Sequence, residues 1–418
     1  MTAERHKSAV QPLSGCRVLE IGSTVAGPFC GRMLADFGAE VIKVEPAEGD
    51  PVRTMGKQID GQSLYSASIF RNKRLLALDL RRDEGRALVR DLAAKSDIVV
   101  ENFKPGTLEK WGLGWSDLSA INPRLIMVRI SGFGQDGPYS HRPGYGVVCE
   151  AVSGLRHLTG DPDRPPSRVG VSMTDYIAGL HGAYGAVMAL MMREKTGRGQ
   201  VIDAALYECA FNFMEAWIPA YDKLGFIPDR TGARLIGSTP NNLYPTADGS
   251  WIHITAMADN LFRRLAKAMG QPSLATDPRF ADHVDRNENH AALDAIISEW
   301  TSGKPLSELE AILEAAVIPA TRIFTIEDIF NDPHYRARQS IVHAPDTHLG
   351  TVAMAAVVPR LSETPGEVRH AGRDVGEDSR SVLQDVLGLD DKMIDSLVHS
   401  GIVAERDTAA AGETRVSA

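Results

Sequence analysis

The sequence contains few cysteines, and none of them lies in a metal-binding or redox pattern. Cys16, Cys30, Cys149 and Cys209 are far apart, without a CxxC pair or the Cys/His spacing of a zinc site. We interpret them as small buried residues in a reducing compartment. HExxH and GxSxG segments are also missing, so neither zinc-dependent hydrolysis nor serine-hydrolase chemistry is indicated, and we expect no metal.

Long apolar runs and an excess of positive charge are missing as well. No run of about eighteen apolar residues is present, and no apolar segment of the kind found in secretion signals follows Met1. The formal net charge is −9, which argues against general nucleic-acid binding but leaves room for a local basic cluster that binds an anionic ligand. We expect a cytoplasmic protein with no nucleic-acid or membrane partner.

The first half of the chain alternates short apolar segments with amphipathic ones. Residues 16–21 and 40–45 read as strands on either side of a helix over 29–37, which Gly38 ends. Such a βαβ unit predicts a parallel sheet and therefore an α/β fold. The alternation continues in further strands and helices, which we expect at 74–80, 83–95, 97–101, 125–130, 175–194 and 201–205.

A second, smaller domain is predicted after a turn-rich segment near 227–234. Its expected elements are a strand at 251–255 and helices near 259–269, 289–302 and 305–316. The predicted division is a large domain over 13–225 completed by 335–400, a small α+β domain over 226–334, and a flexible tail over 401–418.

Gly22, Gly27 and Glu45 invite comparison with a dinucleotide-binding loop. Such a loop has a G-x-G-x-x-G pattern at the start of the first helix and an acidic residue about twenty positions later. Glu45 has the right place, but the glycine spacing differs, and Pro28 stands where the loop must be tight. We therefore expect no nicotinamide or flavin site and assign the glycines to a turn and to close packing.

Basic residues stand next to two of the predicted strands. Residues 71–74 directly precede one strand and 102–106 directly follow another, and we place both segments at the ligand-binding edge of the sheet. Lys73, Arg74 and Lys104 are then candidates to converge on a polyanion. The alternative, a set of ordinary solvated loop cations, is favoured by spacing alone.

Asp175 opens a predicted helix. A carboxylate in the first turn of a helix is favoured by the helix dipole and by the free N–H groups, which keep it ionised and nucleophilic. Gly179, Gly182 and Gly185 follow, and they allow a ligand or a second chain to approach closely. The alternative is that Asp175 or Thr174 merely caps the helix, and spacing alone favours the cap.

An ordered set of short motifs carries more information than any one of them. The motifs, in chain order, are Val25–Pro28, Gly38–Glu45, Gly49–Asp50, Asn72–Arg74, Leu78–Asp79, Val100–Phe103, Pro105–Gly106, Asn122–Arg124, Ser131–Gly134, Gly137–Pro138, Asp175–Gly179, Thr196–Gln200, Asp332–His334 and Ala337–Arg338. With this set the sequence, over about 13–400, resembles the class III CoA-transferases, the formyl-CoA:oxalate and carnitine CoA-transferase type also called CaiB/BaiF. The resemblance favours Asp175 as a nucleophile over Asp175 as a cap.

The resemblance implies a fold, a mechanism and a set of site residues. The fold would be a Rossmann-like large domain with a parallel sheet plus a smaller α+β domain, in an interlocked homodimer whose C-terminal segment completes the large domain. Asp175 would attack an acyl-CoA thioester and carry CoA to the acceptor acid as a covalent aspartyl-CoA thioester, with no tightly bound cofactor. The implied CoA contacts are Val25 at the mouth of the site, Lys73, Arg74, Asn102 and Phe103, with Arg53 and Lys104 as further candidates.

Two departures from the formyl-CoA:oxalate pattern bear on the substrates. Those enzymes carry a run of glycines where this sequence has residues 236–244, and a glutamine where it has Val25. Formyl-CoA and oxalate are therefore disfavoured. We expect a larger carboxylic or dicarboxylic acid as the acceptor and succinyl-CoA as the donor.

The α-methylacyl-CoA racemases of the same superfamily are the main alternative. They pair the aspartate with a histidine about thirty residues upstream, because a racemase needs two acid/base groups on opposite faces of the α-carbon. Here the matching stretch, 142–146, has no histidine, and His141 is displaced from it. A third alternative, a binding protein without chemistry, requires an exposed and unreactive Asp175.

Overall fold

The computed structural model describes residues 10–406, which divide into two compact units. Residues 156–168, inside the range predicted for the large domain, belong to the second unit together with the segment that follows residue 218. Within the described residues, unit 1 comprises 10–155, 169–218 and 338–406, and unit 2 comprises 156–168 and 219–337.

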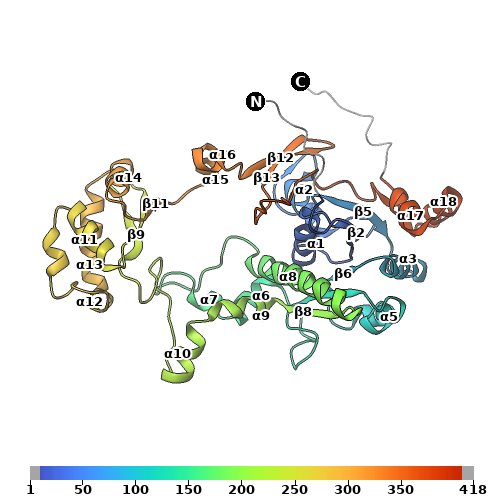
Figure 1. The fold of residues 1–418 in the computed structure, drawn as a ribbon, viewed down its shortest axis with the longest axis horizontal. Coiled ribbons are helices and arrows are strands. Elements are labelled where there is room, and N and C mark those ends of the chain that lie inside the picture. Colours follow the sequence, from blue (N-terminus) through green and yellow to red (C-terminus); the bar gives the residue numbers. More distant parts are fainter. Residues whose placement is uncertain (1–9, 407–418) are drawn as a thin grey trace. The chain divides into compact units, whose positions relative to one another are not determined.

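A seven-stranded sheet forms the centre of unit 1 (Figure 1). Six of its strands are parallel, and the edge strand β14 is antiparallel to its neighbour. The parallel strands are added outward from β1, first on one side and then on the other, which is the doubly wound Rossmann order. Across the sheet the strands are β14 (Val403–Ala404), β5 (Lys73–Leu78), β2 (Glu40–Glu45), β1 (Arg17–Glu20), β6 (Ile98–Glu101), β7 (Ile126–Ser131) and β8 (Val201–Ala205).

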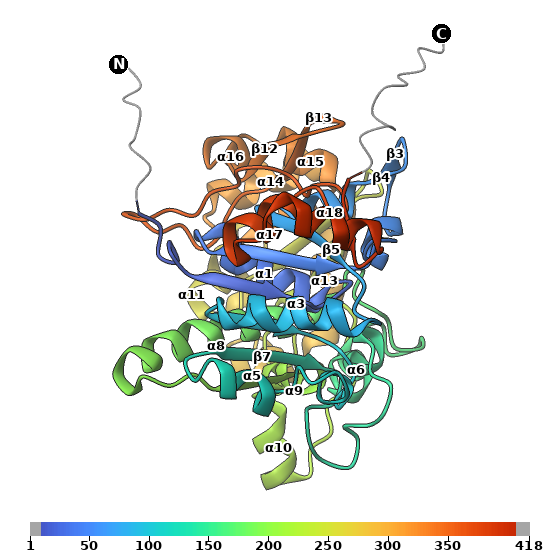
Figure 2. The ribbon, with the colours of Figure 1, turned by 90° about the vertical axis from the view of Figure 1, so that its right-hand side faces the viewer.

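Helices cover both faces of this sheet, which explains why its strands are apolar along most of their length. Figure 2 shows helices on both sides of the sheet. Val18 and Val128 pack with helices on one face, while Leu19 and Met127 pack with helices on the other. On the first face lie α1 (Ala26–Asp36), α6 (Gly146–Val152), α8 (Met173–Thr196) and α9 (Leu206–Phe211), and on the second lie α3 (Asp83–Ala94), α5 (Trp115–Ile121), α17 (Ser379–Leu387) and α18 (Asp391–His399).

The structure confirms the predicted α/β fold and corrects two boundaries. Helix α1 begins one turn earlier than predicted, at Ala26, because Pro28 is tolerated in the first turn of a helix. The predicted tail is wrong in its first residues, since Ile402 and Val403 are buried and β14 pairs with β5. The rest of that tail lies outside the described residues.

Shorter elements connect the layers. The hairpin of β12 and β13 packs against α2 through Ala344, Met354 and Ala67. The connecting elements are η1 (Pro51–Thr54), β3 (Gln58–Ile59), β4 (Gln62–Ser63), α2 (Leu64–Ile69), α4 (Thr107–Lys110), η2 (Asn212–Met214), β12 (Ile341–Asp346) and β13 (Gly350–Ala355). Helices α7 (Leu155–Leu158) and α10 (Trp217–Leu224) begin in unit 1 and continue into unit 2.

Unit 2 contains a three-stranded antiparallel sheet with helices packed on it, as an α+β unit should. Its core includes Tyr244, Ile252, Phe262, Phe280 and Ile297, all with at most 1% of their surface exposed. The elements are β9 (Asn241–Pro245), β10 (Trp251–Thr255), α11 (Asp259–Ala268), η3 (Pro272–Thr276), α12 (His283–Glu288), α13 (His290–Ser302), α14 (Leu306–Ala315), β11 (Ala320–Arg322), α15 (Ile326–Asn331) and α16 (Pro333–Ala337).

Candidate active site

The carboxyl ends of β1 and β6 meet where the strand order of the sheet reverses. The two strands are paired, with Glu20 opposite Val100, and each continues into a turn at the same edge, which we call the carboxyl edge. Strand β1 leads into residues 22–25 and β6 into residues 102–104. Ligands of open α/β sheets bind at such a switch point, so a site is expected here.

Asn102 ties the two turns of the carboxyl edge together. Its Oδ1 accepts a hydrogen bond from the N–H of Ser23 over 2.7 Å, and its Nδ2 donates to the Ser23 carbonyl over 2.9 Å. The amide packs so closely that a Cβ at Gly22 would lie 2.8 Å from Oδ1, and one at Gly27 would lie 3.3 Å from it. The predicted role of these glycines in close packing is therefore confirmed.

A buried ion pair beneath the turn fixes its backbone from below. Lys43 Nζ donates to the Gly22 carbonyl and lies 2.9 Å from Asp50, whose carboxylate accepts from the Thr24 N–H over 3.0 Å. Thr24 keeps a φ of 67°, a left-handed conformation that residues other than glycine rarely adopt. Neighbouring side chains therefore hold the turn in a shape that its own sequence does not favour.

The charges of this pair stabilise each other although both groups are buried. Burial opposes the charged form of Lys43, but Asp50, Glu20 and Glu45 outweigh it and hold the pKa of Lys43 above its usual range. Burial likewise opposes the charge of Asp50, and Lys43 and backbone N–H groups hold the pKa of Asp50 below its usual range. Both groups are therefore charged at neutral pH.

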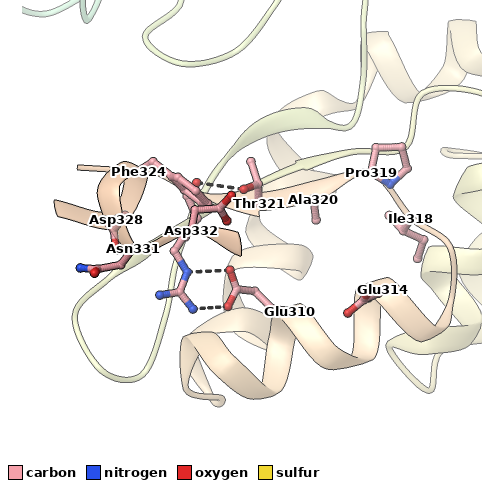
Figure 3. A pocket seen from close by; sticks show the side chains of 11 residues that line it. Glu310, Glu314, Ile318, Pro319, Ala320, Thr321, Phe324, Asp328, Asn331 and Asp332 are labelled. Atoms are coloured by element: carbon pink, nitrogen blue, oxygen red, sulfur yellow. Dashed lines mark hydrogen bonds and ion pairs between the residues drawn. The ribbon is translucent and has the colours of Figure 1, made fainter. Parts of the chain in front are cut away.

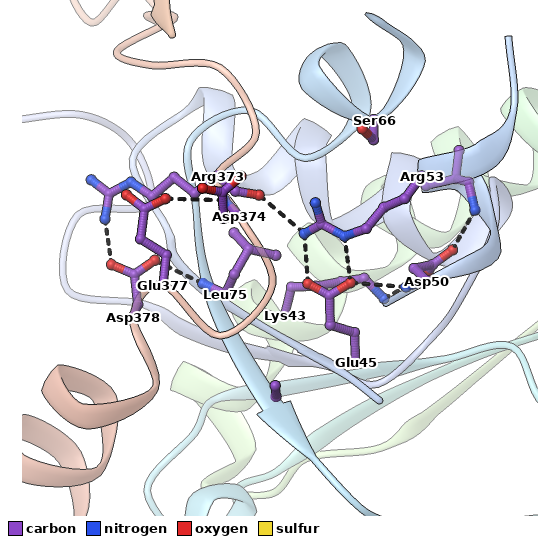
Figure 4. A network of polar contacts seen from close by, with 12 residues as sticks. Lys43, Glu45, Asp50, Arg53, Ser66, Leu75, Arg373, Asp374, Glu377 and Asp378 are labelled. Atoms are coloured by element: carbon purple, nitrogen blue, oxygen red, sulfur yellow. Dashed lines mark hydrogen bonds and ion pairs between the residues drawn. The ribbon is translucent and has the colours of Figure 1, made fainter. Parts of the chain in front are cut away.

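Arg53, a predicted CoA contact, extends this network on one side (Figure 4). Its guanidinium binds Glu45 through two hydrogen bonds of 2.8 and 2.6 Å and donates to the Arg373 carbonyl over 3.0 Å. Glu45 also accepts from the Asp50 N–H over 2.9 Å. Glu45, which stands where a dinucleotide-binding protein has its ribose ligand, is thus hydrogen-bonded to groups of the protein itself.

As predicted, Asp175 lies in the first turn of a helix, α8. Its side chain is half-buried. The neighbouring Thr174 is buried, and its hydroxyl donates to the carbonyl of Gly146 at the start of α6 over 2.8 Å. On the other side Tyr176 packs edge-on against Phe29 of α1, with the ring centroids 4.8 Å apart. Asp175 therefore sits where α1, α6 and α8 begin or meet.

An apolar wall connects Val25 with the start of α8. Val25 is buried in a cluster with Phe70, and Phe29, Tyr65 and Tyr176 pack against that cluster. The hydroxyl oxygens of Tyr65 and Tyr176 are 2.7 Å apart, within hydrogen-bond distance. Val25 and Asp175, predicted from distant parts of the sequence, therefore border the same region of unit 1.

Two ionisable groups near Asp175 stay neutral. Burial first, and the negative charge of Asp175 second, raise the pKa of the Cys149 thiol to about 11. Burial, the hydroxyl of Tyr176 and the charge of Asp175 raise the pKa of Tyr65 above its usual range. Since both groups keep their protons at neutral pH, neither competes with a carboxylate as a nucleophile.

Lys73 and Arg74 do not lie at the carboxyl edge. They open β5, whereas Asn102 follows β6, and β5 runs parallel to β6 through β2 and β1. Residues that precede one parallel strand and residues that follow another lie at opposite edges of a sheet. The prediction that both basic segments share the ligand edge is therefore wrong, and we call the edge of Lys73 the amino edge.

The two cations of the amino edge are bound by carboxylates of the chain itself. Lys73 has no exposed surface, and its Nζ donates to Glu20 over 2.6 Å. Burial lowers the pKa of Lys73 to about 8, although the charge of Glu20 opposes the change. Arg74 forms ion pairs of 2.7 Å with both Glu40 and Asp385.

Phe103 and Lys104 follow β6 at the carboxyl edge, as predicted. Phe103 packs against Trp111 with ring centroids 5.2 Å apart, and its N–H donates to Glu101 over 2.8 Å. Lys104 is exposed and forms no ion pair within residues 10–406. Of the predicted cations, Lys104 is the one whose charge is available at this edge.

The glycines of α8 serve packing inside the chain. A Cβ at Gly179 would lie 2.8 Å from the Ala26 carbonyl oxygen of α1, and one at Gly182 would lie 3.0 Å from Val128 of β7. A Cβ at Gly185 would likewise meet β8. The prediction that these glycines admit a ligand or a second chain is therefore wrong.

Lys43 and Asp50 were not predicted as part of the site, although the sequence contains a signal for them. Lys43 lies in the middle of an apolar strand. A lysine in a strand of a sheet that is covered on both faces is buried, so its charge needs partners within the chain. That requirement points to Asp50, which follows in the next loop. For Gly146, whose carbonyl accepts from Thr174, the sequence contains no comparable signal, because only the tertiary structure shows which side chains lie against it.

Unit 2 contains a cavity of about 640 Å³ with an acidic rim (Figure 3). Glu310, Glu314, Asp328 and Asp332 contribute to the rim, and Arg322 binds Glu310 through two hydrogen bonds. Among the described residues, no group of three or more histidine, cysteine or acidic side chains is arranged to hold a metal ion. No helix in the described part of the chain has the length and apolar character to span a bilayer.

Comparison with known proteins shows the family of this chain. The sequence model of CoA-transferase family III matches residues 13–379. The chain belongs to this family. It is 51% identical to the succinyl-CoA–D-citramalate CoA-transferase of Chloroflexus aurantiacus, over 91% of this chain and 95% of that protein. It is 42% identical to the succinyl-CoA–L-malate CoA-transferase beta subunit of the same organism, over 92% of this chain and 96% of that one.

A solved structure supports the family III fold. A CaiB/BaiF family protein from Brucella suis has a TM-score of 0.81 and 36% identity, over 90% of this chain and 99% of that one. The predicted family and enzyme class are thereby confirmed: the protein is a CoA-transferase that uses acyl-CoA. The racemase and the binding-protein alternatives receive no support from these relatives.

Proposed function

We propose that Asp175 is the nucleophile of this family III CoA-transferase. The observation that carries the proposal is the position of its carboxylate in the first turn of α8, beside the carboxyl edge that Val25 and Asn102 form. The N-terminal turn of a helix favours negative charge, and the nearby Cys149 and Tyr65 stay protonated. Asp175 is therefore the group best suited to attack a carbonyl carbon.

In the proposed reaction every step breaks one activated acyl bond and forms another, so an activated acyl group is present throughout. The Asp175 carboxylate attacks the thioester carbonyl of the donor, which releases CoA thiolate and leaves a mixed anhydride. The thiolate attacks the aspartyl carbonyl, so that the donor acid leaves and an aspartyl-CoA thioester forms. The acceptor carboxylate attacks this thioester, and the released thiolate then attacks the acceptor acyl carbon. The new acyl-CoA leaves, and the carboxylate of Asp175 is regenerated.

The proposed CoA site is the carboxyl edge. Val25 borders it, the Asn102 amide fixes the turn at its floor, and Phe103 and Lys104 follow directly. The exposed ammonium of Lys104 suits a phosphate group of CoA. Arg53 stays a candidate contact, although its guanidinium already binds Glu45. Lys73 and Arg74 act in this proposal through their internal ion pairs.

We propose succinyl-CoA as the donor and a hydroxy-dicarboxylic acid of the citramalate or malate kind as the acceptor. The support is the pair of relatives with 51% and 42% identity, whose names give succinyl-CoA with D-citramalate and with L-malate. The sequence also favours a larger acid than oxalate, because the glycine run of the formyl-CoA:oxalate enzymes is missing from 236–244. A panel of acids with succinyl-CoA, followed by mass spectrometry, tests this choice. The cytoplasmic location stays a prediction.

We also propose a homodimer, built in part on an apolar face of α8. Leu180, Tyr184, Met188 and Met191 lie on one side of this helix and are 45–63% exposed. Phe213 of η2, 58% exposed, extends this face beside His181. An apolar surface of this extent on a single chain marks an interaction site.

Light scattering after gel filtration tests the dimer. The double variant Y184E/M191E should run as a monomer, because two buried charges would oppose association. Met393→Glu is the matched control, since Met393 is 53% exposed on α18, which covers the other face of the sheet. A dimer that survives the double variant would contradict the proposed surface.

Asp175→Asn tests the nucleophile with the smallest change of shape. The amide is a poor nucleophile, so we expect transfer to fall by more than about 10³-fold while CoA binding and the fold are kept. Incubation of the wild-type enzyme with acyl-CoA and hydroxylamine should place a hydroxamate on Asp175, detectable by peptide mass spectrometry. Transfer at the wild-type rate in the variant, or a hydroxamate elsewhere, would overturn the mechanism.

A further inference from the structure

The carboxylate of Asp175 occupies the space that a side chain at residue 146 would need. An ideal Cβ placed on Gly146 would lie 2.0 Å from Asp175 Oδ2, 3.0 Å from its Cγ and 3.0 Å from the Thr174 hydroxyl oxygen. The backbone of Gly146 is an ordinary helical start, without a positive φ. Its conformation is therefore open to any residue, and the space alone excludes a side chain.

The start of α6 is pinned, so it cannot move away from Asp175 at low cost. Gly132 at the end of β7 crosses Gly144 so closely that a Cβ on either would lie 2.5 Å from the other's Cα. The thiol of Cys149 donates to the Gly132 carbonyl over 3.3 Å. The Thr174 hydroxyl ties Gly146 to the first turn of α8 over 2.8 Å. These contacts fix the distance between the two helix starts.

We infer that Gly146 and Thr174 form a positioning pair that holds one carboxylate oxygen of Asp175 against α6 and so orients the other. This inference rests on the proposed role of Asp175. The backbone of Gly146 acts as the back wall behind Oδ2, and the Thr174 hydroxyl keeps that wall at its distance. The oxygen on the far side is then the one that faces a reacting carbonyl.

The steric argument predicts which part of the structure yields when a methyl group is added. The closest atom to the new Cβ is the end of a flexible side chain, whereas the helix starts are held by several contacts. The carboxylate must therefore rotate away by about 1 Å or more to reach an ordinary van der Waals distance. Such a displacement of a reacting group costs roughly 100-fold in rate, while the fold stays intact.

The test compares Gly146→Ala with Gly170→Ala by steady-state kinetics. Gly170 is exposed, has no positive φ, and a Cβ there meets nothing within 4 Å. We expect Gly146→Ala to lower kcat about 100-fold and leave the acyl-CoA KM within about twofold. We expect Gly170→Ala to match the wild type. The rate of hydroxamate formation on Asp175 should fall in step with kcat, whereas partial unfolding would lower only its final amount.

A second pair of variants keeps the inference testable if Gly146→Ala does not fold. Thr174→Val removes the hydroxyl at constant shape and should lower kcat, and Thr174→Ser should restore it because the hydrogen bond to Gly146 returns. Wild-type kcat in Gly146→Ala, or in Thr174→Val, would overturn the inference. If Asp175→Asn is inactive while Gly146→Ala is fully active, the positioning pair fails and the proposed nucleophile stands.

Discussion

The two edges of the parallel sheet in unit 1 carry similar residues that have different roles. At the amino edge, Lys73 and Arg74 are bound by carboxylates, and Lys73 has no exposed surface. At the carboxyl edge, Asn102 binds the backbone of a turn, and Lys104 faces outward without an ion pair in the described chain. The same side-chain chemistry therefore holds the fold together at one edge and remains available for a ligand at the other.

The difference follows from the direction of the strands. In a doubly wound sheet the helices start near the carboxyl ends of the strands, so the turns there present free N–H groups and remain open. At the amino end of β5, by contrast, Arg74 is covered by α17 through Asp385 and Ser381. A basic side chain that is covered needs an acidic partner within the chain, whereas one that is exposed to water can remain unpaired and available to bind a substrate.

The largest effect should come from removing the buried ammonium of Lys73, which extends from the start of β5 to Glu20 at the end of β1. Lys73→Met leaves the carboxylate of Glu20 buried without its closest partner, 2.6 Å away, and should cost about 3–5 kcal/mol of unfolding free energy. Urea unfolding measures the loss. Glu20→Gln in the same chain should recover part of it, because the buried carboxylate, left with only the more distant Lys43 at 3.8 Å, then carries no charge. A Lys73→Met protein of wild-type stability with a raised acyl-CoA KM would contradict the conclusion that Lys73 stabilises the fold and does not bind CoA.

A smaller effect, on binding rather than stability, should come from the carboxyl edge. Asn102→Ala removes both hydrogen bonds to Ser23 and frees the turn, so we expect the acyl-CoA KM to rise about tenfold, or roughly 1.4 kcal/mol. Asn122→Ala is the matched control at the amino edge, where that amide binds Ser96 and the N–H of Arg124. It should destabilise the fold to a similar degree and leave KM alone. Equal KM values in the two variants would count against the switch-point site.

The smallest effect concerns pH and the amino edge. Burial lowers the pKa of His370, whose backbone carbonyl accepts from the N–H of Asn72 just before β5. A base with a lowered folded-state pKa contributes stability that is complete above the unfolded value of 6.5 and is lost as the pH falls below it. His370→Phe should therefore show a smaller drop in melting temperature between pH 7.5 and pH 5.5 than the wild type. An unchanged drop would show that other groups cause it.

Regular structure could be predicted from the sequence because its signals are local. The strand at 97–101 and the helices at 83–95 and 305–316 appear within one or two residues of the expected bounds, since apolar periodicity and turn residues act over a few positions. The predictions were wrong where a segment distant in the sequence determines whether a strand forms or what a residue contacts. Strand β14 forms only because β5 offers an open edge, and the glycines of α8 face α1 rather than a ligand.

The sequence by itself determined the α/β fold, the family and the place of Asp175 at a helix start. Periodicity, capping and the ordered motifs act along the chain, so they can be recognised from the sequence alone. The tertiary structure decided which charges are available and what surrounds the carboxylate. Lys73 meets Glu20, Asn102 meets Ser23 and Asp175 meets Gly146 across 53, 79 and 29 positions of sequence. Such contacts depend on how strands and helices are ordered in space, and that order puts the wall behind Asp175 and the partner beside Lys73.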